Sequence, residues 1–452
     1  MSHTNNSRAF SAPGKALLVG GYLVLDARYK SYVVALSARM HAVVTTSHES
    51  HEDDFLTISV QSAQFNNNEW NYTAYSAQGF KPIERDGLSN PFIEQVVFTV
   101  CNYFNPVKTS HNCIKIEIYS DPQYHSNEET RVVSNGVREF YFHTRDIQDV
   151  PKTGLGSSAG LVSVLTTALC SVFMSNLNIN NKKHVGMIHN LAQIAHCQAQ
   201  GKIGSGFDVA AATFGSVIYQ RFSPDVISNL PQLKVEDIVG FQKVLKDTVD
   251  KVDWKTTADT VNLPPGFKLI MGDVNTGSET VKLVQCVKQW YADHEPKSLG
   301  VYKEIDENNM KVISTCQNLN RLAATNTSHY REMMNSLSMG DISEYPELET
   351  LRSAIHVIRK NFRLITAESG AEIEPAVQTE LLDNCEKLDG VVAGVVPGAG
   401  GYDAIALIAA ETTDIEAETK GKSGFQNVTW LKLQQAHKGL QEEDSASYNN
   451  LS

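Results

Sequence analysis

Apolar residues alternate with polar ones, or form short apolar runs, along much of the first third of the chain. Residues 9–12 and 17–25 flank Pro13-Gly14-Lys15, and this pattern predicts a strand, a tight turn that carries Lys15, and a second strand. Isoleucines alternate with charged residues over 113–120, which is typical of a half-buried strand. Further strands are predicted over residues 32–36, 40–46, 56–65 and 139–143.

Three segments in the first half of the chain have helical patterns. Pro91 opens the first helix at a position that favours proline. Residues 161–176 are apolar nearly all round, which predicts a central buried helix. Residues 185–200 have one apolar face and end at Gly201, as a glycine-terminated helix does. The polar segment 121–135 is expected to be an exposed loop.

The second half of the chain mixes strands with paired helices. The proline-punctuated segment 223–265 suits a crossover, so we expect two domains, residues 1–225 and 226–452. The order of the elements indicates an α+β sandwich with helices on one side of an antiparallel sheet. The elements predicted here are strands at 267–274, 390–396, 404–409 and 428–433, helices at 279–290, 308–324, 346–365 and 375–388, and a polar tail at 434–452.

The composition is that of an acidic globular protein. The 452 residues suffice for two or three domains, and 42% hydrophobic with 20% charged residues is ordinary. The formal net charge of −12 argues against a general binder of nucleic acid or anionic membranes. The seven cysteines are scattered, and no window resembles a signal peptide or a membrane span. We therefore expect a cytoplasmic protein with reduced thiols, a monomer or homodimer that binds neither nucleic acid nor membrane.

The segment from Pro151 to Gly160 contains the strongest chemical signal. Gly154 and Gly156 permit backbone conformations and close approaches that a Cβ would block. A helix that starts at Ser157 or Ser158 would direct its free N–H groups and positive dipole end over this loop, which is how helices bind phosphate. The alternative is a glycine turn that merely precedes a capped helix. Lys15 has its own alternative, an ordinary solvated charge.

Several well-known nucleotide and metal sites are excluded by the absence of their motifs. The chain has no G-x-x-x-x-G-K-[ST] segment, no H-R-D or D-F-G set and no H-E-x-x-H or cysteine–histidine metal spacing. Gly154-Leu155-Gly156 matches the start of a dinucleotide fingerprint, but residues 149–153 before it are not a buried strand, which that motif requires.

Three separated segments together resemble the motifs of the GHMP kinases, a superfamily that includes galactokinase, homoserine kinase and mevalonate kinase. They are Pro13-Gly14-Lys15 with its apolar strand, the loop at 154–159, and the glycine turn at 398–401. Residues 201–211 and 275–284 are similar to those of the fungal phosphomevalonate kinases within that superfamily. The resemblance implies an N-terminal ribosomal-protein-S5-like domain and a C-terminal ferredoxin-like α/β sandwich, with the site in the cleft between them. It also implies ATP-dependent phosphorylation of 5-phosphomevalonate to the 5-diphosphate in the mevalonate pathway to sterols, with Mg²⁺.

The resemblance assigns roles to residues of every motif. Lys15 and Asp208 match the catalytic pair, and Ser158 matches the residue that contacts the metal. Residues expected to hold ATP are Asn90, Lys152, Gly154, Leu155, Gly156, Ser157, Ser158, Ala159 and Gly160. Residues expected at the acceptor are Lys15, Tyr22, Lys202, Ser278, Ser369 and Gly400. For Ser158, Asn90, Tyr22, Ser278 and Ser369 the alternative is a helix cap or a turn bond, and for Asp208 it is a turn aspartate.

The chemistry of a phosphate acceptor changes what Asp208 has to do. Phosphoryl transfer depends on positioning and charge neutralisation. A phosphomonoester with its second pKa near ~6 is already largely ionised at neutral pH, so we expect Asp208 to orient the acceptor and pair with Lys15 rather than remove a proton. Two anions must meet, which calls for added cations: Lys15 and Lys152 first, then Lys202, Arg138 and Arg145.

The sequence departs from the wider superfamily in two places. Gly20 and Gly21 stand where many relatives have an acidic residue, and helix residues 196–200 offer no carboxylate where mevalonate kinase has a glutamate metal ligand. Metal would then be held by Ser158, ATP oxygens and water. Two alternatives remain: a kinase for another acceptor, such as mevalonate or a sugar, and a non-catalytic relative that binds a metabolite as a regulator.

Overall fold

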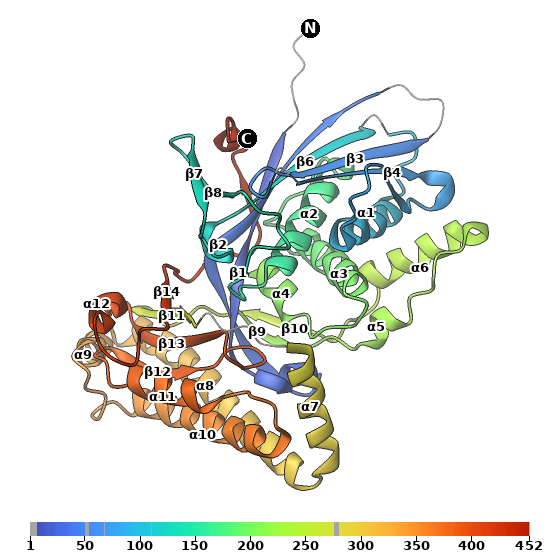
Figure 1. Cartoon of the computed structure of the whole chain (residues 1–452). Coiled ribbons are helices and arrows are strands. Elements are labelled where there is room, and N and C mark those ends of the chain that lie inside the picture. Colours follow the sequence, from blue (N-terminus) through green and yellow to red (C-terminus); the bar gives the residue numbers. More distant parts are fainter. Residues whose placement is uncertain (1–6, 50–53, 67, 110, 275–279, 452) are drawn as a thin grey trace.

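The computed structural model describes residues 7–49, 54–66, 68–109, 111–274 and 280–451, which form two large sheets with their helices and one small two-stranded sheet (Figure 1). In the first sheet β1 (Arg8–Val19) and β2 (Lys30–Ser47) form a long antiparallel pair, joined through a 3₁₀ turn at Gly21–Leu25. The strand β3 (Phe55–Ser62) runs parallel to β6 (Cys113–Ser120), and the other pairings of this sheet are antiparallel. The path of the sheet is β10 (Thr257–Thr260), β9 (Val217–Gln220), β2, β6 (Cys113–Ser120), β3 (Phe55–Ser62), β4 (Asn68–Tyr75) and β5 (Pro82–Glu84), with β15 (Gln441–Glu443) paired to β1.

Helices cover one face of this sheet, with α2 (Ser157–Phe173) at their centre. Thirteen of its residues are buried, because it packs on β1, β2 and three neighbouring helices. This confirms the predicted buried helix. The other helices of this layer are α1 (Pro91–Phe104), α3 (Lys182–Ala199), α4 (Phe207–Phe214), α5 (Asp225–Ser228) and α6 (Ile238–Asp250).

The second sheet is antiparallel throughout and has the order β12 (Val391–Val395), β13 (Ala404–Ala410), β11 (Phe267–Asp273), β14 (Thr429–Leu431). Its side chains alternate between two separate apolar cores. Ala406 and Ile408 pack with α8–α10, whereas Ile405 and Leu407 pack with α11 and α12. The expectation of helices on one side only is therefore wrong, because α11 and α12 cover the other face. The helices are α7 (Thr280–Asp293), α8 (Lys297–Thr325), α9 (Thr327–Ser338), α10 (Pro346–Ser369), α11 (Ala376–Cys385) and α12 (Ile415–Thr419).

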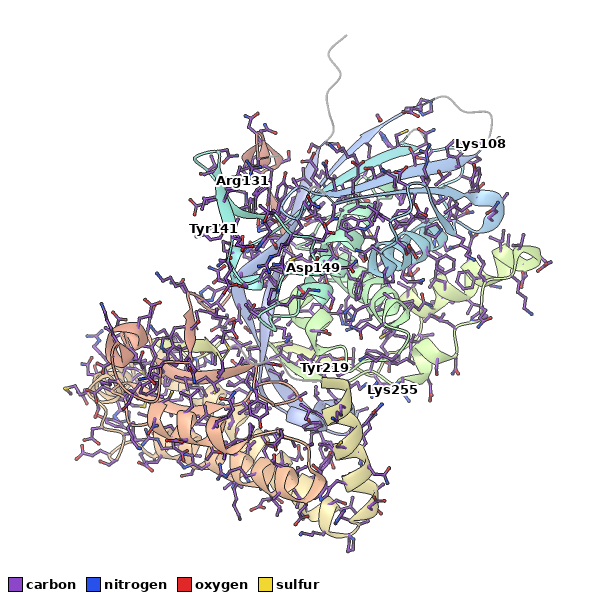
Figure 2. All side chains as sticks on the ribbon, viewed as in Figure 1. Lys108, Arg131, Tyr141, Asp149, Tyr219 and Lys255 are labelled. Atoms are coloured by element: carbon purple, nitrogen blue, oxygen red, sulfur yellow. The ribbon has the colours of Figure 1, made fainter. Side chains whose placement is uncertain are left out.

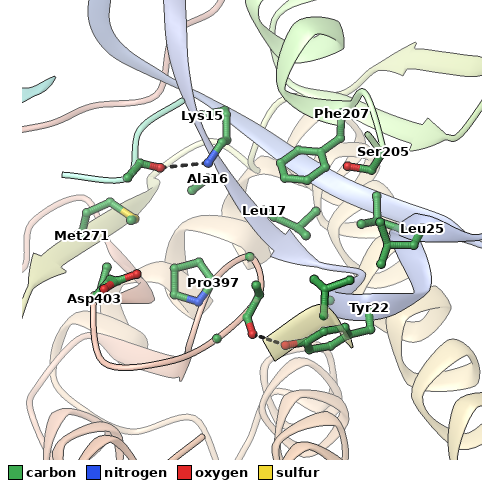
Figure 3. Close-up of a pocket in the computed structure, with 18 of the residues that line it drawn as sticks. Lys15, Ala16, Leu17, Tyr22, Leu25, Ser205, Phe207, Met271, Pro397 and Asp403 are labelled. Atoms are coloured by element: carbon green, nitrogen blue, oxygen red, sulfur yellow. Dashed lines mark hydrogen bonds between the residues drawn. The ribbon is translucent and has the colours of Figure 1, made fainter. Parts of the chain in front are cut away.

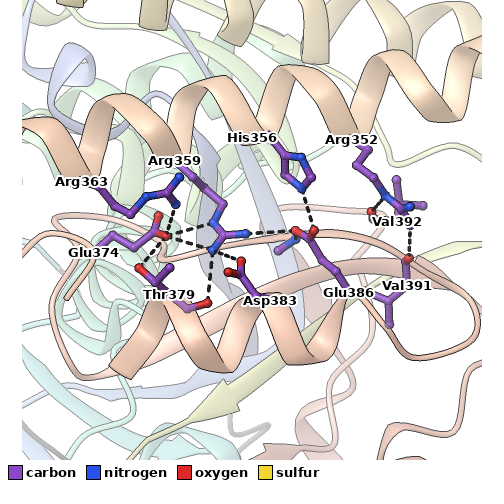
Figure 4. Close-up of polar contacts among 11 residues, drawn as sticks. Arg352, His356, Arg359, Arg363, Glu374, Thr379, Asp383, Glu386, Val391 and Val392 are labelled. Atoms are coloured by element: carbon purple, nitrogen blue, oxygen red, sulfur yellow. Dashed lines mark hydrogen bonds and ion pairs between the residues drawn. The ribbon is translucent and has the colours of Figure 1, made fainter. Parts of the chain in front are cut away.

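A buried ion-pair network joins α10 to α11 (Figure 4). The side chain of Arg359 is 2% exposed and reaches the carboxylates of Glu374, Asp383 and Glu386 at 2.8–3.2 Å. A buried arginine is stable only where its donors are satisfied, so removal of one partner is costly. On the same helix, Arg352 donates to the carbonyls of Val391 and Val392 and covers the edge of β12.

The structure differs from the sequence-based prediction near Lys15. Residues 8–19 form one strand, and the expected tight turn is a register shift between Pro13 and Gly14, so Lys15 lies inside β1. The apolar run 21–25 is a 3₁₀ turn and not a strand, because Gly20 and Gly21 adopt positive φ values of 133° and 49° there.

Segments expected to be irregular also contain elements. The predicted loop 121–135 includes β7 (Thr130–Ser134), which pairs with β8 (Glu139–His143). The segment 223–265 includes α5, α6 and β10, which stay with the first sheet and its helices. The polar tail includes β15, which pairs with β1, and α9 is an additional helix. No described helix is long and apolar enough to cross a membrane.

Candidate active site

A cavity of about 270 Å³ lies where β1, the 3₁₀ turn and the loop before α2 meet the second sheet (Figure 3). Lys15, Ser205 and Asp403 are polar residues of a mostly apolar lining, and Tyr22 forms part of the wall. The lining thus combines segments that are far apart in the sequence, and all three sequence motifs contribute to it. The other lining residues are Ala16, Leu17, Gly21, Val24, Leu25, Thr153, Gly154, Phe207, Met271, Val284, Pro397, Gly398, Ala399, Gly400 and Ala404.

Lys15 is fixed by the glycine loop. Its backbone N–H donates to the Leu155 carbonyl at 3.0 Å, and its Nζ donates to the Gly154 carbonyl at 2.9 Å (Figure 3). The Nζ also lies 5.6 Å from the centre of the Phe207 ring, within cation–π range. Removal from water lowers the pKa of Lys15, and the charge of the nearby Asp208 opposes that shift.

The helix α2 begins as the loop pattern predicts, but it is not capped by a serine. Gly156 is the N-cap with φ 82°, and no side chain caps the helix. The first intrahelical bond runs from the Gly160 N–H to the Gly156 carbonyl. The N–H groups at the start of the helix therefore stay available for an anion. A Cβ on Gly156 would lie 3.0 Å from Lys15 Cε, so the glycine allows the lysine to pass close to the loop.

The hydroxyl of Ser158 lies against α3. Its Oγ is 3.1 Å from the Nε2 of His196, a buried residue whose ring stacks on Phe92 at 5.8 Å between centroids. The same nitrogen is 3.1 Å from the Gln200 amide. Histidine thus occupies the helix segment that lacks a carboxylate. Among the described residues, no cluster of three or more histidine, cysteine or acidic side chains could hold a metal by itself.

A second cavity, of about 210 Å³, lies on the other side of the glycine loop. Lys152, Ser157 and Ser158 line it, whereas Gly154 lines the first cavity, so the loop is the wall between them. Asn90 also lines the second cavity, and its Oδ1 caps α1 by accepting from the N–H groups of residues 92 and 93. The arrangement can hold a nucleoside on one side of the loop and an acceptor on the other, with the helix end between them.

Asp208 is in the first turn of α4, and its Oδ1 accepts from the Val209 N–H at 2.9 Å. It lines neither cavity, although its neighbours Ser205 and Phe207 line the first one. No ion pair joins Asp208 to Lys15 among the residues that the structure describes, so the expected pairing is not formed here. Their coupling is a longer-range effect of the Asp208 charge on Lys15.

Some of the remaining predicted residues lie at the first cavity and others lie away from it. Tyr22 donates its hydroxyl to the Ala399 carbonyl at 2.6 Å and ties the 3₁₀ turn to the glycine turn, where Gly400 lines the first cavity. Lys202 is exposed and lines neither cavity, and Ser369 accepts from the Ala371 N–H at the end of α10. Ser278 falls outside the described residues.

The other members of the loop are structural in this conformation. The side chains of Leu155 and Ala159 are buried, and a Cβ on Gly160 would lie 2.7 Å from Met40, so Gly160 lets α2 pack against β2. Arg138 pairs with Glu443 and is not at either cavity.

Sequence reasoning missed three groups of this site. Ser205 and Phe207 lie in the glycine-rich segment 201–211, and the resemblance of that segment to the phosphomevalonate kinases is the sequence feature that could have identified them. His125 lines the second cavity and forms an isolated bridge with Lys152, but its loop gave no signal. Burial lowers the pKa of His125 to about 3, which keeps its ring neutral.

Comparison with known proteins finds one matching family model and several relatives in sequence. The model of the GHMP kinases N terminal domain matches residues 130–216. The chain is 43% identical to the phosphomevalonate kinase of Candida albicans, over 98% of this chain and 100% of that protein. It is 35% identical to the phosphomevalonate kinase of Gibberella zeae, over 90% and 89% of the two chains.

Solved structures share the fold. Phosphomevalonate kinase from Streptococcus pneumoniae in complex with phosphomevalonate and AMPPNP aligns with a TM-score of 0.61 at 15% identity, over 95% of this chain and 99% of that chain. Mevalonate kinase from L. major in complex with R-mevalonate aligns with a TM-score of 0.54 at 13% identity, over 94% and 95%. The two-domain α+β architecture expected from the sequence is therefore confirmed.

Proposed function

This chain belongs to the phosphomevalonate kinases of the GHMP kinase superfamily, and on that premise we propose that it transfers the γ-phosphoryl group of ATP to the phosphate of (R)-5-phosphomevalonate. The product is (R)-5-diphosphomevalonate, in the mevalonate route to isopentenyl diphosphate and sterols. The observation that carries the proposal is the position of Lys15. Its ammonium group lies in the first cavity beside the open N-terminus of α2, where the charge of a transferred phosphoryl group would develop.

Each part of the site has a task in this reaction. The second cavity would hold the nucleoside, with Lys152 near its phosphates, and the α2 N–H groups would bind the β- and γ-phosphates. Lys15 would leave the Gly154 carbonyl for a phosphate oxygen. This exchange is favourable because a charge-assisted bond to an anion is stronger than one to a neutral carbonyl. Asp208 would act by supporting the positive charge of Lys15, which orients the acceptor, and not as a base, since the acceptor oxygen is already ionised near neutral pH.

Magnesium would be held as a partly hydrated ion, because the described residues offer no cluster of three or more histidine, cysteine or acidic side chains to surround it. Ser158 would be its protein ligand, and ATP oxygens with water would complete the shell, as magnesium's slow dehydration favours. When bound, the ion would neutralise phosphate charge in the transition state.

The apolar walls of the first cavity support a small acceptor with one charged end near Lys15. Mevalonate is the alternative acceptor, because it shares the carbon skeleton and lacks only the phosphate. A phosphate acceptor is preferred because it arrives ionised and needs no base, and Asp208 does not line the cavity as a base would.

A coupled ADP-release assay tests the proposal with phosphomevalonate, mevalonate, homoserine and galactose. We expect kcat/KM to be highest for phosphomevalonate, by about 10- to 100-fold over mevalonate, where each tenfold corresponds to ~1.4 kcal/mol. Lys15→Met should lower kcat by about 10²- to 10³-fold. The control Lys303→Met removes a lysine of α8 whose side chain is 78% exposed. Equal or better turnover of mevalonate would overturn the choice of acceptor.

We place this activity in the cytoplasm. All seven cysteines are free thiols, and five of them are buried, which suits a reducing compartment. Cell fractionation with an antibody against the chain tests this placement, and recovery in an organelle fraction contradicts it.

A further inference from the structure

The loop at residues 203–206, between α3 and α4, is held by side chains that donate hydrogen bonds to its carbonyl groups. Arg221, just after β9, donates to the Ile203 carbonyl at 3.0 Å and to the Gly204 carbonyl at 2.7 and 3.2 Å. Tyr219 on β9, which is labelled in Figure 2, donates to the Ser205 carbonyl at 2.8 Å. Every one of these three carbonyls therefore has a side-chain donor from the same strand end.

The fourth carbonyl of the loop is held from α3. Gln193, which is fully buried, donates its Nε2 to the Gly206 carbonyl at 2.7 Å. When side chains donate to four consecutive carbonyls, the orientation of the peptide planes between them is fixed. The loop therefore has little freedom at the residues that precede α4, and α4 begins at Phe207 with Asp208 in its first turn.

The same arginine also holds a second segment that lines the first cavity. Its Nη1 donates to the carbonyl of Leu25, the last residue of the 3₁₀ turn, at 2.5 Å. Leu25 and Tyr22 line the cavity from that turn, and Ser205 and Phe207 line it from the loop. One planar guanidinium thus spans two walls, and a lysine cannot replace it because its single nitrogen cannot hold three carbonyls in a fixed geometry.

We infer that Arg221 is a positioning residue for the acceptor: it sets the distance between the 3₁₀ turn and the 203–206 loop, and through that loop it places Ser205 and Asp208. The inference rests on the proposed function and deepens it. Arg221 lines neither cavity, so it acts through these backbone carbonyls and not on the substrate. The second cavity lies beyond the glycine loop and should be insensitive to Arg221.

The test is the pair of variants Arg221→Lys and Arg352→Lys in the full chain. Arg352 is a matched control, because it also donates to two carbonyls, those of Val391 and Val392, at 2.7 and 3.0 Å, but at the edge of the second sheet. For Arg221→Lys we expect the KM for phosphomevalonate to rise by about 10-fold and kcat to fall by about 10-fold, as misplacement of reacting groups implies, with the KM for ATP within about 2-fold of wild type. Arg352→Lys should leave all three kinetic values within about 2-fold.

Two further measurements keep the outcome interpretable. Tyr219→Phe removes the hydroxyl that donates to the Ser205 carbonyl and should raise the acceptor KM by about 5-fold, since one neutral hydrogen bond is worth about 1 kcal/mol. Amide hydrogen exchange should become faster at residues 203–208 in Arg221→Lys and not in Arg352→Lys.

The inference is overturned if Arg221→Lys raises the KM for ATP and for the acceptor equally, or if exchange at 203–208 is unchanged. A wild-type chain that phosphorylates none of the tested acceptors would refute the proposed function instead. In that case hydrogen exchange alone would decide whether Arg221 holds the loop.

Discussion

Two glycines of the turn at 398–401 allow a test of backbone strain against steric clash. An alanine at one of them would be strained only by its φ angle, and an alanine at the other would also collide with the backbone. Gly398 and Gly400 both have positive φ values, 71° and 80°. A Cβ on Gly398 would meet nothing within 4 Å, whereas a Cβ on Gly400 would lie 2.3 Å from the Ile373 carbonyl oxygen and 2.7 Å from the Ile373 Cα. The pair therefore separates conformational strain from steric conflict with the backbone.

The cost of each change follows from this geometry. Gly398→Ala should destabilise the protein by about 1 to 2 kcal/mol, the usual penalty for a left-handed alanine. Gly400→Ala carries the same penalty and a further ~1 to 3 kcal/mol for overpacking, because a backbone oxygen cannot move aside as a flexible side chain can. Relief of the clash must displace the turn from Ile373, and the bond from the Gly401 N–H to that carbonyl, 2.9 Å long, would be lost.

The functional consequence should appear in the acceptor and not in the nucleotide. The turn lines the first cavity and contributes the Ala399 carbonyl that accepts from Tyr22, but no turn residue lines the second cavity. We expect Gly400→Ala to raise the KM for phosphomevalonate by about 10-fold or more, about 1.4 kcal/mol of binding. The KM for ATP should change by less than about 2-fold.

Urea unfolding at 25 °C and steady-state kinetics of wild type, Gly398→Ala and Gly400→Ala provide the measurement. If the two variants lose equal stability and have equal KM values for phosphomevalonate, the steric argument is refuted. If Gly400→Ala raises only the KM for ATP, the turn belongs to the nucleotide half of the site, and the division into two cavities is wrong.

Three further predictions follow from the same structure. Gly156→Ala should lower kcat more than Gly154→Ala, because both residues are left-handed but only the Cβ at Gly156 would meet Lys15, at 3.0 Å; equal kcat values would contradict this. Asp208→Asn should lower kcat by about 10-fold or more through lost charge, and raising the pH should not restore it; a variant rescued at high pH would show that a base is needed. The pKa of His125 is lowered from 6.5 to about 3, so between these pH values the unfolded chain binds a proton that the folded chain does not. The free energy of unfolding should therefore be highest above pH 6.5 and decrease by ~1.4 kcal/mol per pH unit as the pH falls toward 3. Urea unfolding at pH 7 and pH 5 should show that slope, and His125→Leu should reduce it.

The sequence predicts those parts of the site whose geometry is local. Gly154 and Gly156 followed by an apolar run were sufficient to locate the start of α2 and the loop before it, and the structure has Gly156 as the N-cap of that helix. The neighbourhood of Lys15 was predicted less well, because Pro13-Gly14 is as compatible with a bulged strand as with a turn, and only pairing with β2 decides between them.

Long-range partners could not be predicted from the sequence. Arg221 is one of 39 lysines and arginines, and its role depends on carbonyls 17, 18 and 196 residues away. His196 was visible only as a residue of a predicted helix, and its contact with Ser158 requires α2 and α3 to pack side by side. Similarly, β15 has three polar residues, so its place beside β1 is set by tertiary contacts and not by an apolar pattern.

The pairing of β15 with β1 has a consequence for biosynthesis. The strand β1, which carries Lys15, is translated long before its partner, and Ala9, Phe10 and Ser11 can pair with residues 441–443 only after those residues have left the ribosome. Until then the nascent chain presents an unpaired strand edge, which is a template for association with other chains. A chain truncated before Gln441 would therefore keep this edge of β1 unpaired and be prone to aggregate, even though every residue that lines the two cavities precedes Gln441.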